Sequence, residues 1–192
     1  MNISKFLRLS LGQWRSQRTG HTWDTCEIDK LNMTLDIVAL TLDDTSVVRV
    51  CRQCDIDPET ATFPFQVTWL HPGQTEVAPD DRGIFVPIPQ PDNANFGRML
   101  QSHRNSSSPV TIGKYHFNPD GTFVLTTEHP ATIIEEKIWF ATPNLRLQVF
   151  VSKPKAAGDQ ATTTFISENR VISGVASDSA IGTATGTVTT SA

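Results

Sequence analysis

The sequence predicts a mainly β protein that folds as one closed antiparallel barrel, with a helix at its N-terminus and one further short helix. Two observations favour this fold class. From Thr62 onwards, apolar side chains alternate with polar ones in short segments that turn signals separate, as is typical of antiparallel sheets. Only 38% of the 192 residues are hydrophobic, below the usual share of about 45–50%. A low share is expected where strands enclose a polar hollow.

Both predicted helices lie in the first third of the chain. Apolar side chains at helical spacing indicate an amphipathic helix from Ser4, its cap, to Trp14. A second three-to-four period indicates a short helix that ends at Cys54 and has Thr45 or Ser46 as its cap.

The remaining segments are predicted to be strands. A polar stretch after the first helix fits a strand in which Ser16 and Arg18 share a face. A strand over 83–88 contains Pro87, which indicates a sheet edge or a bulge. A hairpin is expected across residues 118–121, because Pro presets one φ angle and Gly supplies a positive one. The full set of predicted strands is 15–23, 33–41, 62–69, 83–88, 98–102, 109–117, 122–128, 133–141, 145–151 and 161–172.

Composition and charge exclude several classes of function. With 16 basic and 20 acidic residues the net charge is −4, so the chain lacks the basic excess with which proteins bind nucleic acid. No apolar stretch approaches the roughly 18 residues of a membrane span, and the first residues lack the apolar core of a signal peptide. We expect one barrel domain over residues 1–173 and a disordered tail over 174–192, which is rich in Ala, Thr, Ser and Gly.

The three cysteines are too few for a disulfide scaffold and fit a reducing cytosol. Cys51 and Cys54 form a C-x-x-C pair, but a zinc site usually needs a second such pair. We therefore interpret both thiols as packing groups and predict no metal site.

A Gly-x-Trp motif follows the first helix at Gly12 and Trp14. This opening resembles that of lipocalin-type barrels, in which the Trp closes the barrel base and an Arg of the last strand packs over it. Arg170 is the candidate partner. The role of this motif would be structural.

Ionisable residues stand inside several strand patterns, above all Glu136, Arg146 and Glu168. Strand alternation leaves two alternatives open: each side chain faces solvent, or it points inward and lines a ligand cavity. An inward Arg would bind a carboxylate, and an inward Glu would hold or donate a proton. Trp69 and Trp139 offer flat faces to a planar ligand, unless they only fill the core.

Four segments together resemble the S/U-type (CpcS/CpeS) phycobiliprotein chromophore lyase family. The opening reads F-L-x-x-S-x-G-x-W-x-S-Q-R-T over residues 6–19, and W-F-A-T-P-N-L-R-L spans residues 139–147. F-Q-V-T-W at residues 65–69 resembles a middle strand of that family, and T-T-F-I-S-E-N-R at 163–170 its closing strand.

This resemblance implies a lipocalin-like barrel and a lyase that joins a linear tetrapyrrole to a cysteine of an apo-phycobiliprotein subunit by a thioether. The bilin, phycocyanobilin or phycoerythrobilin, would be its substrate, with no tightly bound cofactor. The implied location is the cyanobacterial cytosol, or the plastid stroma of an alga. The implied binding residues are Arg18, Trp69, Trp139, Arg146 and Gln148, and the implied catalytic residues are Glu136, Glu168 and His21. The nucleophile would come from the acceptor, so neither Cys51 nor Cys54 needs a chemical role.

The sequence departs from the family pattern at two positions. Thr22 follows His21 where many members have a second His, and Gln148 stands where many have a second Arg. Two alternatives therefore stay open: a non-catalytic subunit that works with a related lyase in a heterodimer, and a plain carrier of a bilin or another hydrophobic ligand. A homodimer is also compatible with the resemblance.

Overall fold

A computed structural model describes the chain except for residues 22–27, 75–77, 79–80, 104–108, 157–159 and 173–192; no side chain is described for residues 21, 28–30 and 103. Its helices are α1 (Ile3–Ser10), α2 (Thr45–Gln53) and the short 3-10 helix η1 (Pro58–Thr60). Its strands are β1 (Gly12–His21), β2 (Ile28–Ala39), β3 (Phe65–Leu70), β4 (Arg82–Gln90), β5 (Asn93–His103), β6 (Thr111–Phe117), β7 (Phe123–Glu128), β8 (Thr132–Thr142), β9 (Leu145–Pro154) and β10 (Thr162–Arg170).

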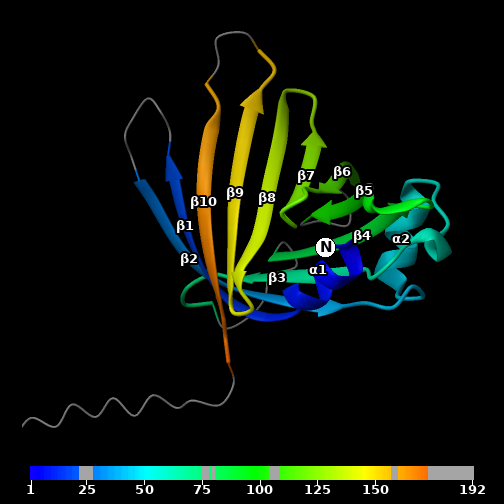
Figure 1. The fold of residues 1–192 in the computed structure, drawn as a ribbon, viewed down its shortest axis with the longest axis horizontal. Helices are drawn as coiled ribbons and strands as arrows, with labels where there is room; N and C mark the ends of the chain where they lie inside the picture. Colours follow the sequence, from blue (N-terminus) through cyan, green and yellow to red (C-terminus); the bar gives the residue numbers. More distant parts are fainter. Residues whose placement is uncertain (22–27, 75–77, 79–80, 104–108, 157–159, 173–192) are drawn as a thin grey trace, which may run out of the picture.

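The ten strands form a closed barrel in which each strand pairs with its neighbours in the sequence and β1 pairs with β10 (Figure 1). All of these pairings are antiparallel. The predicted fold class is thus confirmed. Because the chain reverses at each turn, the β1–β2, β3–β4, β5–β6, β7–β8 and β9–β10 connections share one end of the barrel, which we call the open end. The helix α1 supplies lining residues at the other end, the base.

The first helix is shorter than predicted, and Trp14 lies in β1 instead. Helix α1 begins after Asn2, not at Ser4, because the Asn2 side chain accepts a hydrogen bond from the Lys5 N–H at 2.9 Å. Gly12, at φ +100°, turns the chain from the helix into the strand. A backbone angle of that sign favours glycine and cannot continue a helix. The helical spacing of Trp14 was therefore misleading.

Helix α2 lies on the outside of the barrel against β4 and β5 (Figure 1). Its cap is Asp44, not Thr45 or Ser46, because the Asp44 side chain accepts from the Ser46 N–H at 2.8 Å. Cys51 is buried in the core between this helix and the sheet. Burial raises the pKa of both Cys51 and Cys54, as expected for thiols that pack.

Two local strand predictions agree with the structure, and several strand ends differ. The hairpin turn has Gly121 at φ +86° and joins Phe117 to its partner Phe123. Pro87 lies beyond the last residue of β4 that pairs with β3, so it behaves as an edge residue there. Strands β2 and β5 begin five residues earlier than predicted, at Ile28 and Asn93, because tertiary pairing extends strands beyond their local signal. The predicted disordered tail lies outside the described residues.

Candidate functional site

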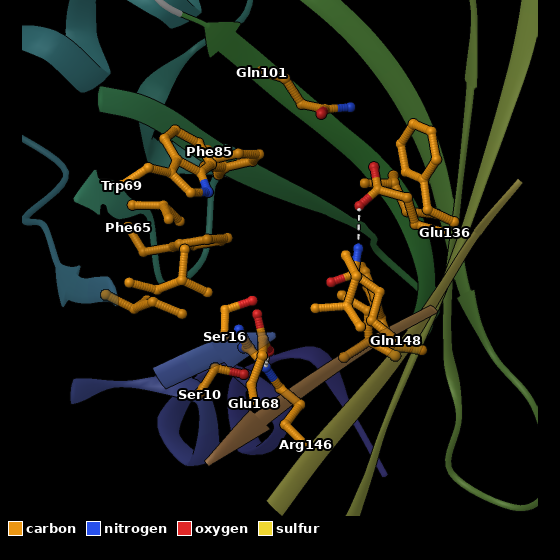
Figure 2. Close-up of a pocket in the computed structure, with 18 of the residues that line it drawn as sticks. Ser10, Ser16, Phe65, Trp69, Phe85, Gln101, Glu136, Arg146, Gln148 and Glu168 are labelled. Atoms are coloured by element: carbon orange, nitrogen blue, oxygen red, sulfur yellow. Dashed lines mark hydrogen bonds and ion pairs between the residues drawn. The ribbon is translucent and has the colours of Figure 1, made fainter. Parts of the chain in front are cut away.

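The barrel encloses a cavity of about 440 Å³ that α1 and all ten strands line. Period-two alternation along each strand turns every second side chain inward. One wall of the cavity is aromatic, formed by Phe65, Trp69 and Phe85, and Glu136 and Gln148 project from the wall opposite (Figure 2). The polar lining residues of α1 and the strands are Ser10, Ser16, Arg18, Gln101, Thr111, Thr127, Glu136, Arg146, Gln148 and Glu168.

The base of the barrel is closed by Trp14, which is fully buried. Its indole N–H donates to the Ser10 carbonyl oxygen at 2.8 Å. The guanidinium carbon of Arg170 lies 4.2 Å from the centre of the Trp14 ring, and this Arg also donates to the carbonyl oxygens of Leu9 and Leu11, each at 2.6 Å. The predicted cation–π pair is confirmed, and it fastens the last strand to α1.

An ion pair lies on the cavity floor above this closure. Arg146 Nε and Glu168 Oε2 are 2.5 Å apart, and their side chains are only 7% and 3% exposed. Strand register explains the pairing, because Glu168 of β10 stands opposite Arg146 of β9 on one side and Ser16 of β1 on the other. The guanidinium carbon of Arg146 also lies 5.1 Å from the Trp14 ring centre. The floor is therefore a charged pair that packs on the Trp14 indole, and Figure 2 shows Arg146 and Glu168 side by side.

A second acid stands higher in the cavity. Gln148 Nε2 donates to Glu136 Oε2 at 3.0 Å (Figure 2). Burial raises the pKa of Glu136 from an ordinary 4.5 to about 7, although the bond from Gln148 works in the opposite direction. A carboxyl group with such a pKa exists in both protonation states near neutral pH, as suits a proton donor.

Arg18 and Trp69 complete the predicted set inside the cavity. Arg18 follows Ser16 along β1 towards the open end and is exposed, and it has no ion-pair partner among the described residues. Trp69 packs edge-on against Phe85, with ring centres 6.4 Å apart, and Phe85 stacks on Phe65 at 5.0 Å. This arrangement offers flat apolar surface on one side and the exposed guanidinium of Arg18 near the opening.

Comparison with known proteins places this barrel in a family. The family model described as "CpeS-like protein" matches residues 2–171. The chain belongs to the CpeS-like family. It is 36% identical over 172 residues to "Chromophore lyase CpcS/CpeS 3" of Trichodesmium erythraeum, covering 88% of this chain and 99% of the relative. It is 41% identical over 151 residues to "Putative phycoerythrobilin lyase CpeS" of Microchaete diplosiphon, covering 76% of this chain and 66% of the relative.

The CpeS-like barrel also resembles a solved structure, the S-type phycobiliprotein lyase CPES from Guillardia theta. The TM-score is 0.73 at 28% sequence identity, with 91% of this chain and 95% of that chain covered. Among the described helices, none has the length and apolar character needed to cross a membrane.

Two of the predicted site residues are not placed in the cavity of this CpeS-like protein. Trp139 does not line it, because Glu136 and Ile138 of β8 point inward and Trp139 lies on the opposite face of that strand. The prediction that Trp139 lines the pocket is wrong, and the inward position of Glu136, three residues away, could have excluded it. His21 is the last residue of β1, and its side chain lies outside the described ones.

Several cavity residues were not predicted. Ser10 contributes from α1, and Gln101 donates to the Thr127 hydroxyl at 3.0 Å across the cavity wall. The alternation of Phe123, Leu125 and Thr127 is a signal that could have placed Thr127 inside. His71 and Asp81 line the cavity from the β3–β4 connection, and no strand pattern marks them.

The raised pKa of Glu136 predicts a pH dependence of stability. The folded state holds this proton more tightly than the unfolded state, so the stabilisation is complete below pH 4.5 and is lost as pH rises to about 7. In chemical denaturation, the free energy of unfolding of the native protein should fall by up to about 3 kcal/mol between pH 5 and pH 8 because of Glu136. The Glu136→Gln variant should lack this fall. Equal pH dependence in both proteins would contradict the assignment.

Proposed function

We propose that this protein is a phycobiliprotein chromophore lyase: it binds a linear tetrapyrrole in the barrel and attaches it by a thioether to a cysteine of an apo-phycobiliprotein subunit. The supporting observation is the cavity, whose aromatic wall faces two carboxyl groups and two arginines. Its volume of about 440 Å³ lies within the usual range of small-molecule pockets, about 300–1,000 Å³. Relatives at 36% and 41% identity carry the names chromophore lyase and putative phycoerythrobilin lyase.

The two arginines have different roles, one toward the ligand and one toward Glu168. A bilin carries two propionates, and Arg18 has no ion-pair partner among the described residues and lies nearer the open end. Arg18 therefore binds a propionate. Arg146 is already paired with Glu168 on the floor, so its first role is to hold that carboxylate in place. The rings of Trp69 and Phe85 pack against the conjugated system.

The two carboxyl groups divide the chemistry. Glu168, next to Arg146, accepts hydrogen bonds from pyrrole N–H groups, whereas Glu136, with a pKa of about 7, donates a proton. Gln148 orients Glu136 through its hydrogen bond. The thiol adds across the ethylidene double bond of the bilin: sulfur bonds to the outer carbon, and the ring carbon takes up a proton. Protonation of the conjugated system makes the outer carbon more electrophilic, and a rigid pocket holds one conformer ready for attack.

The proposal is tested by mixing the purified protein with phycocyanobilin or phycoerythrobilin and following bilin absorbance, then adding candidate apo-subunits. We expect saturable binding, followed by a covalent product that fluoresces with zinc on a denaturing gel and forms faster than without the protein. Binding without faster transfer would identify a carrier. Transfer only when a related lyase subunit is added would identify the non-catalytic partner of a heterodimer. Either result would overturn the proposal for the protein acting alone.

Arg18→Gln is expected to weaken bilin binding at least tenfold, because one propionate loses its counter-ion and an Arg–carboxylate pair contributes about 1.5–3 kcal/mol. Fluorescence quenching of the cavity tryptophan provides the measurement. Arg15→Gln is the matched control, because Arg15 is exposed on the opposite face of β1 and should bind normally. If both variants bind bilin with equal affinity, Arg18 does not bind a propionate.

The outer wall of β8, β9 and β10 supports a second copy of this chain as partner. Trp139 stands beside Leu147, and Val149 beside Phe165, in the strand register; Phe165 is 52% exposed. The acceptor cysteine has to reach the open end, which leaves this side wall to another molecule. Sedimentation velocity should detect a dimer at micromolar concentration that Phe165→Asp dissociates. A monomeric native protein would contradict this assignment.

A further inference from the structure

A histidine–aspartate pair lies at the open end of the cavity, apart from the two glutamates that act on the bilin. His71 directly follows β3 and Asp81 directly precedes β4, and both line the cavity. His71 Nε2 and Asp81 Oδ1 are 3.7 Å apart, with side chains 38% and 14% exposed. The pair thus joins solvent on one side to the cavity on the other.

The backbone holds His71 in a tight turn. Its N–H donates to Gln74 Oε1 at 3.0 Å, and its carbonyl oxygen accepts from the Gln74 N–H at 3.1 Å. Gly73 adopts φ +83° in this turn, a backbone angle that glycine adopts without strain. Asp81 is held by a bond from its N–H to the Ala78 carbonyl oxygen at 2.9 Å. Hydrogen bonds therefore hold the backbone at both residues.

The second carboxylate oxygen of Asp81, Oδ2, is buried and has no hydrogen-bond partner among the described residues. A buried carboxylate without a full set of donors is costly, and a protonated imidazole beside it would lower that cost. The arrangement resembles the carboxylate–histidine pairs of catalytic triads. The Asp81 carboxylate faces Nε2 of His71, stabilises the imidazolium and leaves Nδ1 as the proton acceptor. In unliganded proteins such contacts are often long and shorten when the substrate binds.

We propose that His71, positioned by Asp81, is the base that takes the proton from the incoming cysteine thiol of the acceptor subunit. This inference rests on the proposed lyase function and extends it. A cysteine with an ordinary pKa of about 8.5 is only a few per cent thiolate at neutral pH. Glu136 and Glu168 lie deeper and serve the bilin, whereas His71 lies where the acceptor chain arrives.

The step balances without an oxidant or a leaving group. The thiol S–H breaks, its proton goes to His71 Nδ1, and the sulfur electron pair forms the bond to the outer ethylidene carbon. The electrons of the double bond take up a proton at the ring carbon, supplied by Glu136. His71 then releases its proton to solvent, and Glu136 regains one.

The test compares His71→Gln with the native protein in bilin binding and in transfer from pH 6.5 to 9. We expect unchanged bilin affinity, transfer about 100-fold slower at pH 7, and a ratio of native to variant rates that shrinks towards one as pH approaches 9. At that pH the acceptor thiol ionises without help. The other titratable groups lining the cavity, Arg18, His129, Glu136, Arg146 and Glu168, are common to both proteins and cancel in the ratio.

Two further variants separate a chemical role from a structural one. His116→Gln makes the same substitution at a histidine of β6 that stacks on Phe96 and should transfer at the native rate. Asp81→Asn should slow transfer less than His71→Gln, and the double variant should be no slower than His71→Gln alone, because Asp81 acts through His71. Native transfer rates in His71→Gln at pH 7, or a rate ratio that does not change with pH, would overturn the inference while native lyase activity stands. If the native protein transfers no bilin, the proposed function itself fails.

Discussion

Arg146→Ala should lower the free energy of unfolding by about 3–5 kcal/mol, the usual loss when one member of a buried ion pair is removed. The reason is that Glu168, whose side chain is 3% exposed, loses the cation 2.5 Å away and retains a buried charge. Trp14 also loses one of the two guanidinium groups that pack on its ring. Urea denaturation at pH 7 provides the measurement.

The matched control removes both charges. In the double variant Arg146→Met, Glu168→Leu the floor no longer carries an unpaired charge, so most of the lost stability should return, although bilin transfer should not. If the single variant is as stable as the native protein, the floor pair does not carry the energetic role assigned to it. If the double variant is as unstable as the single one, packing rather than charge is responsible.

Glu136→Gln should slow bilin transfer about 100-fold, within the range that general acids contribute, and should leave bilin affinity within about threefold. The amide keeps the size and hydrogen-bonding capacity of the side chain but cannot release the proton that a carboxyl group with a pKa of about 7 provides. In the native protein the donor is depleted as pH rises through 7, so this contribution declines above neutrality. Transfer rates from pH 6 to 8.5 at saturating bilin test this.

Glu135→Gln is the control for this variant. Glu135 is the adjacent residue of β8, and it pairs with Lys137 at 3.2 Å and is not part of the cavity lining. Its transfer rate should equal that of the native protein. A Glu136→Gln variant that transfers bilin as fast as Glu135→Gln would assign the proton donor to another group.

The alternating strands after Thr62 and the Gly12–Trp14 motif with Arg170 could be predicted from the sequence, because strand periodicity and short motifs are local. Alternation alone leaves Glu136, Arg146 and Glu168 either in water or in the cavity, and only the family resemblance favours their inward positions. Trp139 is an odd number of residues from the inward Glu136, so strand alternation places it on the outer face of β8, although its flat ring would suit a planar ligand. Trp14 was assigned to the helix because its spacing is helical, and the positive φ angle of Gly12 is visible only in the fold.

The meander of strands and the closure of the base therefore follow from periodicity and short motifs in the sequence. Which charged groups meet depends on the folded barrel. The register of β1, β10 and β9 brings Glu168 to Arg146. The pairing of β8 with β9 brings Gln148 to Glu136. The fold also brings His71 to Asp81 across the β3–β4 connection, where no alternation of apolar and polar residues marks them. Contacts between strands depend on register and barrel closure, which are properties of the whole sheet and not of any one segment.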